Sequence, residues 1–148
     1  MSLHVKVNIK VLEDTFALIR PHASEFAVSF YKNLFTHYPQ LQPLFVNTTM
    51  QEQEKKLMIS LVLVINNLRN LTYLATLLKD LGERHVRYGT KSEYYPMVGV
   101  ALLKTLESFL GVDWTPEVKQ AWTHAYGAIA DLMLDGKDLQ SGIVWILM

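Results

Sequence analysis

The sequence predicts an all-α protein with one domain, and three observations support this prediction. The chain has 148 residues, too few for two ordinary domains, and 50% of them are apolar, enough to build a core. Apolar residues recur mainly at helical spacings of three and four. The 7 glycines and 5 prolines fall at expected helix ends, and Asp135-Gly136 is the one hairpin-type turn signal.

The first two helices are expected over residues 7–20 and 22–37, with Pro21 between them. One face of the first helix carries Ile9, Leu12, Phe16 and Ile19. One face of the second carries Ala27, Val28, Tyr31, Leu34 and Phe35. Segment 38–47 contains two prolines, which predicts short turns in place of a long helix.

The next two helices are expected over residues 50–68 and 74–88. One side of the third helix carries Gln53, Leu57, Leu61 and Val64. The apolar face of the fourth carries Leu74, Leu78, Leu81, His85 and Tyr88. Gly89 is expected to end this fourth helix.

A fifth helix is expected over residues 92–110, and a sixth begins after Thr115. The fifth aligns Tyr95, Val98, Leu102, Thr105 and Phe109. Thr115, Pro116 and Glu117 form a strong start signal, with a hydroxyl cap, a proline and an acid in the first turn. The sixth helix aligns Val118, Trp122, Ala125, Ile129 and Met133, and Gly136 is expected to end it.

Composition excludes several classes of function. Fourteen basic and 14 acidic residues give a formal net charge of zero, which argues against a nucleic-acid binder. Cysteine is absent, which excludes disulfides, thiolate metal sites and cysteine nucleophiles. The longest apolar stretch, residues 57–65, is about half of a membrane span, and no secretory signal is visible. We therefore expect a cytoplasmic protein.

His85 is the unusual residue on its helix. Leu81 and Tyr88 are its apolar helical neighbours, while Gly82 and Gly89 leave space around the imidazole. A buried imidazole needs partners for both nitrogens. Two interpretations follow: a core histidine bonded to the backbone, or an axial ligand of a haem iron. No two histidines lie three or four residues apart, so a helical zinc site is not predicted.

Five segments, in this order and spacing, resemble the globin domain of bacterial flavohaemoglobins and their single-domain relatives. They are FYKNLFTHYPQLQPLF (30–45), QEKKLM (53–58), LGERHVRYG (81–89), YYPMVGVALLKTL (94–106) and AWTHAYG (121–127). The resemblance covers about residues 7–134 and leaves 135–148 as a tail of unknown role. It implies one globin domain over residues 1–148, with six to seven helices enclosing a pocket for haem b.

The resemblance also implies roles for individual residues. His85 matches the proximal iron ligand, and Tyr95 matches a tyrosine of the proximal hydrogen-bond network. Tyr31 and Gln53 match the distal residues that stabilise a bound ligand, although Tyr31 could also be a core tyrosine bonded to a carbonyl. The residues expected to line the haem are Phe45, Leu57, Leu81, Tyr88, Val98 and Leu102.

The sequence departs from the family pattern near its end. The family has a glutamate in the proximal network where Lys137 stands here, and Asp135 or Asp138 could substitute for it. Such a carboxylate would make the proximal imidazole a stronger donor to iron. The sequence also contains no GxGxxG motif, the glycine pattern of dinucleotide-binding domains, so we expect a separate reductase or other electron donor.

These residues predict a haem protein that reversibly binds O2, and also NO and CO, with high affinity. Hydrogen bonds from Tyr31 and Gln53 to a ligand that gains negative charge would slow its release. The resemblance implies nitric oxide dioxygenation supported by the external electron donor. The alternative is a haem-based gas sensor or interaction module, with the apolar segment 142–148 contacting an output partner. A globin-like fold without haem is the third interpretation.

Overall fold

The computed structural model describes residues 8–70, 72–76 and 94–136, apart from the side chains of residues 95 and 130–136. Within these ranges the chain forms helices and turns, and no strand occurs. The elements are α2 (Ile9–Ile19), η1 (Arg20–His22), α3 (Ala23–His37), η2 (Pro39–Phe45), α4 (Met50–Asn66), α6 (Tyr94–Leu110), η4 (Gly111–Asp113) and α7 (Pro116–Gly136). Residues 72–76 are also helical. The predicted all-α class is confirmed.

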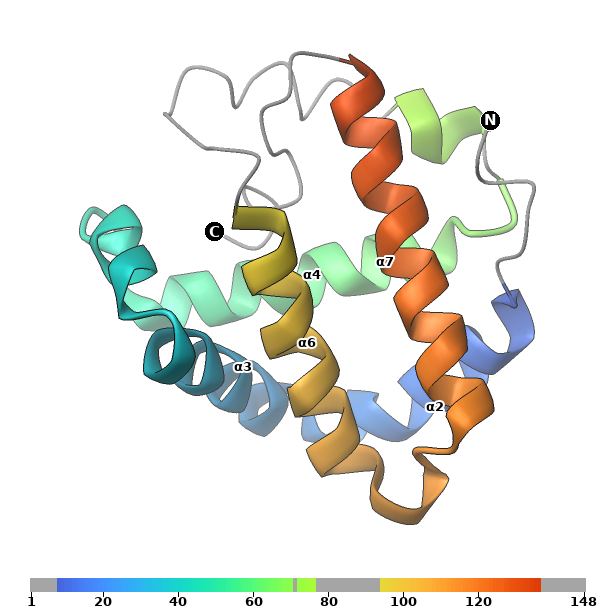
Figure 1. The fold of residues 1–148 in the computed structure, drawn as a ribbon, viewed down its shortest axis with the longest axis horizontal. Coiled ribbons are helices and arrows are strands. Elements are labelled where there is room, and N and C mark those ends of the chain that lie inside the picture. The colour runs from blue at the N-terminus through green and yellow to red at the C-terminus, as the bar shows by residue number, and fades with distance from the viewer. Residues whose placement is uncertain (1–7, 71, 77–93, 137–148) are drawn as a thin grey trace.

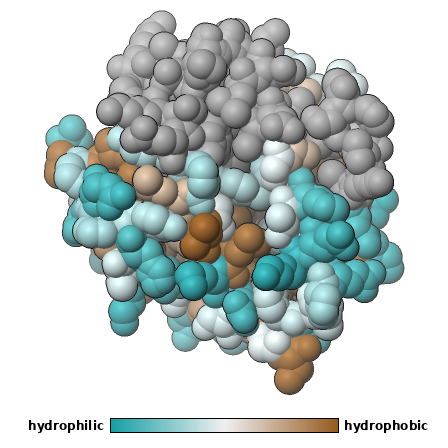
Figure 2. Space-filling view, viewed as in Figure 1, coloured by the Kyte–Doolittle hydropathy of each residue, from teal (hydrophilic) through white to brown (hydrophobic). Residues whose placement is uncertain are grey.

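Helices pack on helices without a sheet between them. The most extensive contacts join α3 to α6 and α4, while α2 and α6 both pack on α7. In Figure 1, α6 and α7 lie in front and α4 crosses behind them. The apolar faces of these helices meet in one core, and the described surface in Figure 2 is mostly hydrophilic with small apolar patches.

Local capping explains where three helices begin. The side chain of Asn8 accepts a hydrogen bond from the Val11 backbone N–H at the start of α2. Thr49 accepts from the Glu52 N–H at the start of α4, over 3.2 Å. Thr115 accepts from the Val118 N–H before α7, also over 3.2 Å. Each cap satisfies a backbone donor that has no partner inside its helix.

The predicted helix ends are also observed where the sequence breaks helical geometry. Pro21 lies in the short 3-10 turn after α2, and the two prolines of segment 38–47 lie in the 3-10 helix η2. Gly111 has φ of 53°, a left-handed conformation that glycine adopts without a steric penalty, and it begins the turn after α6. The described part of α7 reaches Gly136, the residue at which its end is predicted, and the residues that follow lie outside the described ranges.

The buried face of α3 differs from the predicted one. The structure buries Phe26, Ala27, Phe30, Tyr31 and Leu34. Val28 is 49% exposed, so including it in the apolar face was wrong, whereas Phe35 is half-buried and packs against the core. Phe26 and Phe30, four residues apart, complete the buried stripe, and Phe26 contacts Phe109 of α6.

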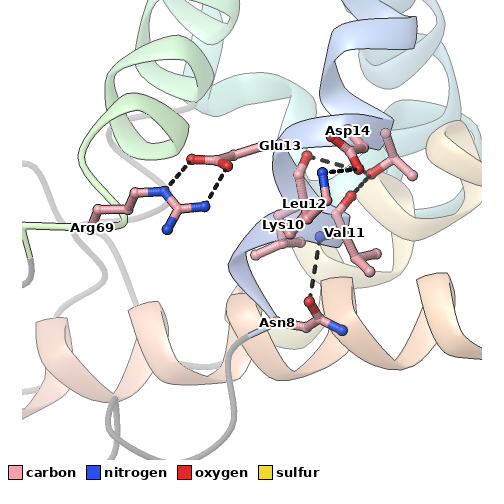
Figure 3. A network of polar contacts seen from close by, with 8 residues as sticks. Asn8, Lys10, Val11, Leu12, Glu13, Asp14 and Arg69 are labelled. Atoms are coloured by element: carbon pink, nitrogen blue, oxygen red, sulfur yellow. Dashed lines mark hydrogen bonds and ion pairs between the residues drawn. The ribbon is translucent and has the colours of Figure 1, made fainter.

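Polar contacts tie distant segments of the fold together. Trp122 Nε1 on α7 donates to Thr15 Oγ1 on α2 over 2.9 Å, and both side chains are buried. Arg69 forms a bidentate ion pair with Glu13 of α2, with N–O distances of 3.0 and 2.8 Å (Figure 3). This second contact is exposed, and the arginine beside Glu13 lowers the pKa of its carboxyl.

Two helices approach closely at Gly99. A Cβ atom placed there would lie 2.8 Å from Cε2 of Tyr126, which is closer than normal contact. Glycine on α6 therefore allows the tyrosine ring of α7 to lie against its backbone. Among the described helices, none is long and apolar enough to cross a membrane.

Candidate functional site

Tyr31 and Gln53, predicted as one pair, meet in the structure. Gln53 Nε2 donates a hydrogen bond to the Tyr31 hydroxyl oxygen over 3.1 Å. Tyr31 is 2% exposed and Gln53 is fully buried, although both carry polar groups. The bond joins α3 to α4 across 22 residues of sequence.

The start of α4 determines where Gln53 lies. The Thr49 cap begins the helix, and the Gln53 N–H bonds to the Thr49 carbonyl in its first turn, over 3.0 Å. Leu57 follows four residues later and lies on the same side of the helix. Both side chains are fully buried, so this side of α4 faces the interior.

Aromatic rings surround the Tyr31 phenol. The ring of Phe45, at the end of η2, lies edge-on to Tyr31 with centroids 5.7 Å apart. Phe30 contacts Tyr31 at 4.9 Å, and Phe35 lies 6.0 Å away. These contacts hold the phenol in one orientation. Phe30 was not among the predicted site residues. Its position four residues after Phe26 could have indicated that both rings lie on one buried face of the helix.

Burial determines the protonation of Tyr31. Removal from water raises the pKa of the phenol far above its usual range, and the negative charge of Glu54 raises it further. The hydroxyl therefore keeps its proton through the whole neutral and moderately alkaline range. Because the oxygen accepts from Gln53, the phenolic hydrogen is directed to a different acceptor. Tyr31 can thus act as a hydrogen-bond donor.

Val98 and Leu102, the predicted lining residues of α6, are both buried. Val98 is 2% exposed and Leu102 is 5% exposed. Leu102 borders an apolar cavity of about 50 Å³ formed with residues of α2, α4 and α7, among them Leu61 and Trp122. The lining of this cavity includes neither member of the Tyr31–Gln53 pair.

Several predicted residues lie outside the part of the chain that the structure describes. These are His85, Leu81, Tyr88, Lys137 and Asp138, together with the side chains of Tyr95 and Asp135. The apolar segment 142–148, on which the sensor alternative depends, is also outside it. The roles given to these residues stay predictions. Within the described ranges, no cluster of three or more His, Asp or Glu side chains could hold a metal ion.

The described residues fit the distal side of a haem pocket. Phe45 and Leu57 supply apolar surface of the kind that covers a porphyrin, and they flank two buried polar side chains. A phenol and an amide beside an apolar site are suitable donors for a small ligand that gains negative charge. An ordinary core position would more often hold an apolar side chain than a fully buried glutamine.

Comparisons with known proteins agree on one family. The model of the family described as Globin matches residues 28–133. A flavohemoprotein of Bacillus subtilis is 29% identical over 128 residues, which is 85% of this chain and 32% of the relative. An uncharacterized globin-like protein of Aquifex aeolicus is 31% identical over 126 residues, covering 85% of this chain and 88% of the relative. The chain thus spans about a third of the length of the flavohemoproteins that it matches.

Solved structures give the same result. A bacterial globin from Campylobacter jejuni superposes with a TM-score of 0.71 at 28% identity, covering 86% of this chain and 92% of that one. An engineered carbene transferase superposes with a TM-score of 0.70 at 28% identity, covering 83% and 84%. That protein is derived from a proposed nitric oxide dioxygenase of Rhodothermus marinus.

Proposed function

Because the chain belongs to the globin family, we propose that it holds haem b and uses it to bind dioxygen and other diatomic gases, NO and CO, reversibly. The observation that carries this proposal is the buried hydrogen bond between Gln53 and Tyr31. This bond joins two polar side chains that are buried beside the apolar side chains of Phe45 and Leu57. A purely structural core would gain little from burying both of them.

The residues that would hold the haem come from both faces of the pocket. His85 would ligate the iron from the proximal side, with Tyr95 in its hydrogen-bond network. Apolar contact with the porphyrin would come from Phe45, Leu57, Leu81, Tyr88, Val98 and Leu102. When bound, the group supplies a ferrous centre at which a diatomic gas binds reversibly.

The distal residues would control how long the gas stays. Tyr31 keeps its proton because it is buried, so its hydroxyl can donate to a ligand oxygen that carries negative charge. Gln53 orients this hydroxyl by donating to its oxygen, and its amide can also face the ligand. A hydrogen bond to a charged group is worth about 1.5–3 kcal/mol. High affinity with slow release is the expected result.

Slow release suits oxidation of nitric oxide better than delivery of dioxygen. The overall reaction combines one nitric oxide, one dioxygen and one electron into one nitrate ion. Turnover therefore needs an electron donor, and we propose a separate reductase for this role. The support is the similarity to flavohemoproteins and to a proposed nitric oxide dioxygenase.

Absorption spectroscopy tests the haem proposal. Reconstituted protein should show distinct ferric, ferrous and carbonmonoxy Soret bands, and His85→Ala should lose or shift them. His124→Ala is the matched control, because His124 lies exposed on α7. If His85→Ala took up iron protoporphyrin with an unchanged Soret band, the proposal would be wrong.

Nitric oxide consumption tests the enzymatic part. With a generic reductase and NADH, the protein should consume nitric oxide over many turnovers and release nitrate. Stoichiometric consumption that stops after one equivalent would contradict dioxygenase turnover. That result would leave reversible gas binding intact and would favour the sensor alternative.

A further inference from the structure

A surface cleft leads from solvent to the candidate site. We propose that this cleft, between α3, η2 and α4, is the route by which small neutral ligands reach the Tyr31–Gln53 pair, and that Glu54 at its mouth disfavours anions. The proposal rests on the proposed function, since it assumes that a gas is bound beside this pair.

The cleft has a volume of about 390 Å³, which is large compared with a diatomic molecule. Its floor includes Tyr31, 2% exposed, and Phe45, 7% exposed. Its rim includes Lys32 and Val46, and Val46 is 74% exposed. The lining therefore runs from solvent to the ring whose hydroxyl accepts from Gln53.

A larger groove on the same side of the molecule does not reach the site. It has a volume of about 550 Å³ and lies between the start of α3 and the middle of α4. Its lining includes Ala27, Met58 and Ile59, but none of Tyr31, Gln53 and Phe45. Of these two openings in the described part of the chain, the smaller one is therefore the candidate route, because only its lining includes Tyr31 and Phe45.

Three aromatic rings separate the cleft from the interior. Phe35 lies against Phe45 with centroids 5.4 Å apart, and both rings contact Tyr31. Phe35 is half-buried and lines the cleft, so part of its ring faces the cleft. Rotation of this ring would open a passage for a small ligand while Tyr31 keeps its bond to Gln53.

The charged side chains at the mouth of the cleft should favour neutral ligands over anions. Lys32 and Glu54 are the charged residues of the cleft lining. Glu54 is half-buried and its charge raises the pKa of the Tyr31 phenol, so its field reaches the floor. Lys32 is exposed, and water screens its charge more strongly. A neutral diatomic molecule passes this field without cost, whereas an anion is repelled.

The absence of native cysteine allows the cleft to be closed at one chosen position. Val28 lines the cleft and is 49% exposed, so Val28→Cys can be labelled with a bulky maleimide. Ile59→Cys, labelled in the same way, is the matched control in the neighbouring groove, where Ile59 is 67% exposed. Mass spectrometry establishes complete labelling, and each unlabelled variant is the baseline.

Carbon monoxide kinetics give the readout for this experiment. We expect the label at position 28 to slow association and dissociation by the same factor, roughly fivefold or more, with unchanged affinity. Equal slowing identifies a route, because a change at the binding site itself would alter affinity. Unchanged rates after complete labelling at position 28, or equal slowing by the label at position 59, would overturn the proposal.

The two failures are distinguishable. If the unlabelled protein shows no carbonmonoxy spectrum, the proposed function is wrong and the route falls with it. If that spectrum is present and the label at position 28 has no effect, only the route is wrong.

The role of Glu54 has a separate test. Glu54→Gln should speed association of azide with the ferric protein by roughly fivefold and leave carbon monoxide association unchanged. Glu52→Gln, an exposed acid on the same helix, should change neither rate. Equal azide rates in Glu54→Gln and the parent protein would refute the role of Glu54.

Discussion

Replacement of Tyr31 by phenylalanine gives the sharpest test of the distal site. The substitution removes one oxygen and keeps the ring with its edge contacts to Phe30 and Phe45. What is lost is the acceptor of the 3.1 Å bond from Gln53 and the donor offered to a bound gas. The fold should therefore survive the change.

The expected size of the effect follows from these two bonds. Loss of a donor to a ligand with negative charge costs about 1.5–3 kcal/mol, which is about 10- to 100-fold in the dioxygen dissociation rate. Association should change much less, because this bond forms after the ligand has entered. The change also removes the buried acceptor of Gln53 Nε2, which should lower the free energy of unfolding by about 1–3 kcal/mol.

Stopped-flow measurement of dioxygen release checks this prediction. Tyr73→Phe is the matched control, since Tyr73 is 49% exposed and lies outside the site. The double variant with Gln53→Leu should be less affected than the two single effects combined, because the two side chains are directly bonded. Equal dissociation rates for Tyr31→Phe and the parent protein would refute the assignment of Tyr31 as a donor.

Three further predictions concern stability. Thr15→Val should lower the free energy of unfolding in urea by about 1–3 kcal/mol, because it removes the buried acceptor of Trp122 Nε1; an unchanged midpoint would contradict this. Burial, and then the charge of Glu54, raises the pKa of Tyr31 above its ordinary 10.0, so the unfolded chain loses this proton first. The free energy of unfolding should therefore fall above about pH 10, by up to about 1.4 kcal/mol per pH unit, and Tyr31→Phe should remove this contribution from urea titrations. Gly99→Ala should cost about 1–3 kcal/mol by thermal melting, because the new methyl group would lie 2.8 Å from Tyr126; a rise in the melting temperature would show that the helices adjust freely.

Helix positions were predictable because their causes are local. Thr115 caps α7 by accepting a hydrogen bond from a backbone N–H three residues away. The prolines of segment 38–47 allow only the short turns of η2. Each of these signals acts within a few residues, so no knowledge of the rest of the fold was needed.

The orientation of α3 was harder to predict. The sequence has apolar residues on more than one side of this helix, including Val28 and Phe35, and periodicity does not say which side is buried. Contact with α6 and α4 decides this, and it buries Phe26 and Phe30 while leaving Val28 on the cleft. Tertiary packing thus decided which of the two apolar faces of α3 is buried.

Prediction of the candidate site needed both the sequence and the tertiary structure. Tyr31 and Gln53 were singled out by resemblance to a family, because spacing within one helix cannot connect residues of two helices. By itself the sequence determined the positions of the described helices, the Thr115 cap and most of the apolar faces, because these depend on neighbours three or four residues apart. Only the tertiary structure decided that Gln53 bonds to Tyr31, that Trp122 bonds to Thr15 across 107 residues, and that a cleft beside Glu54 leads to the site. The physical reason is that the crossing of two helices is set by the side chains of both, so neither segment alone specifies what it contacts.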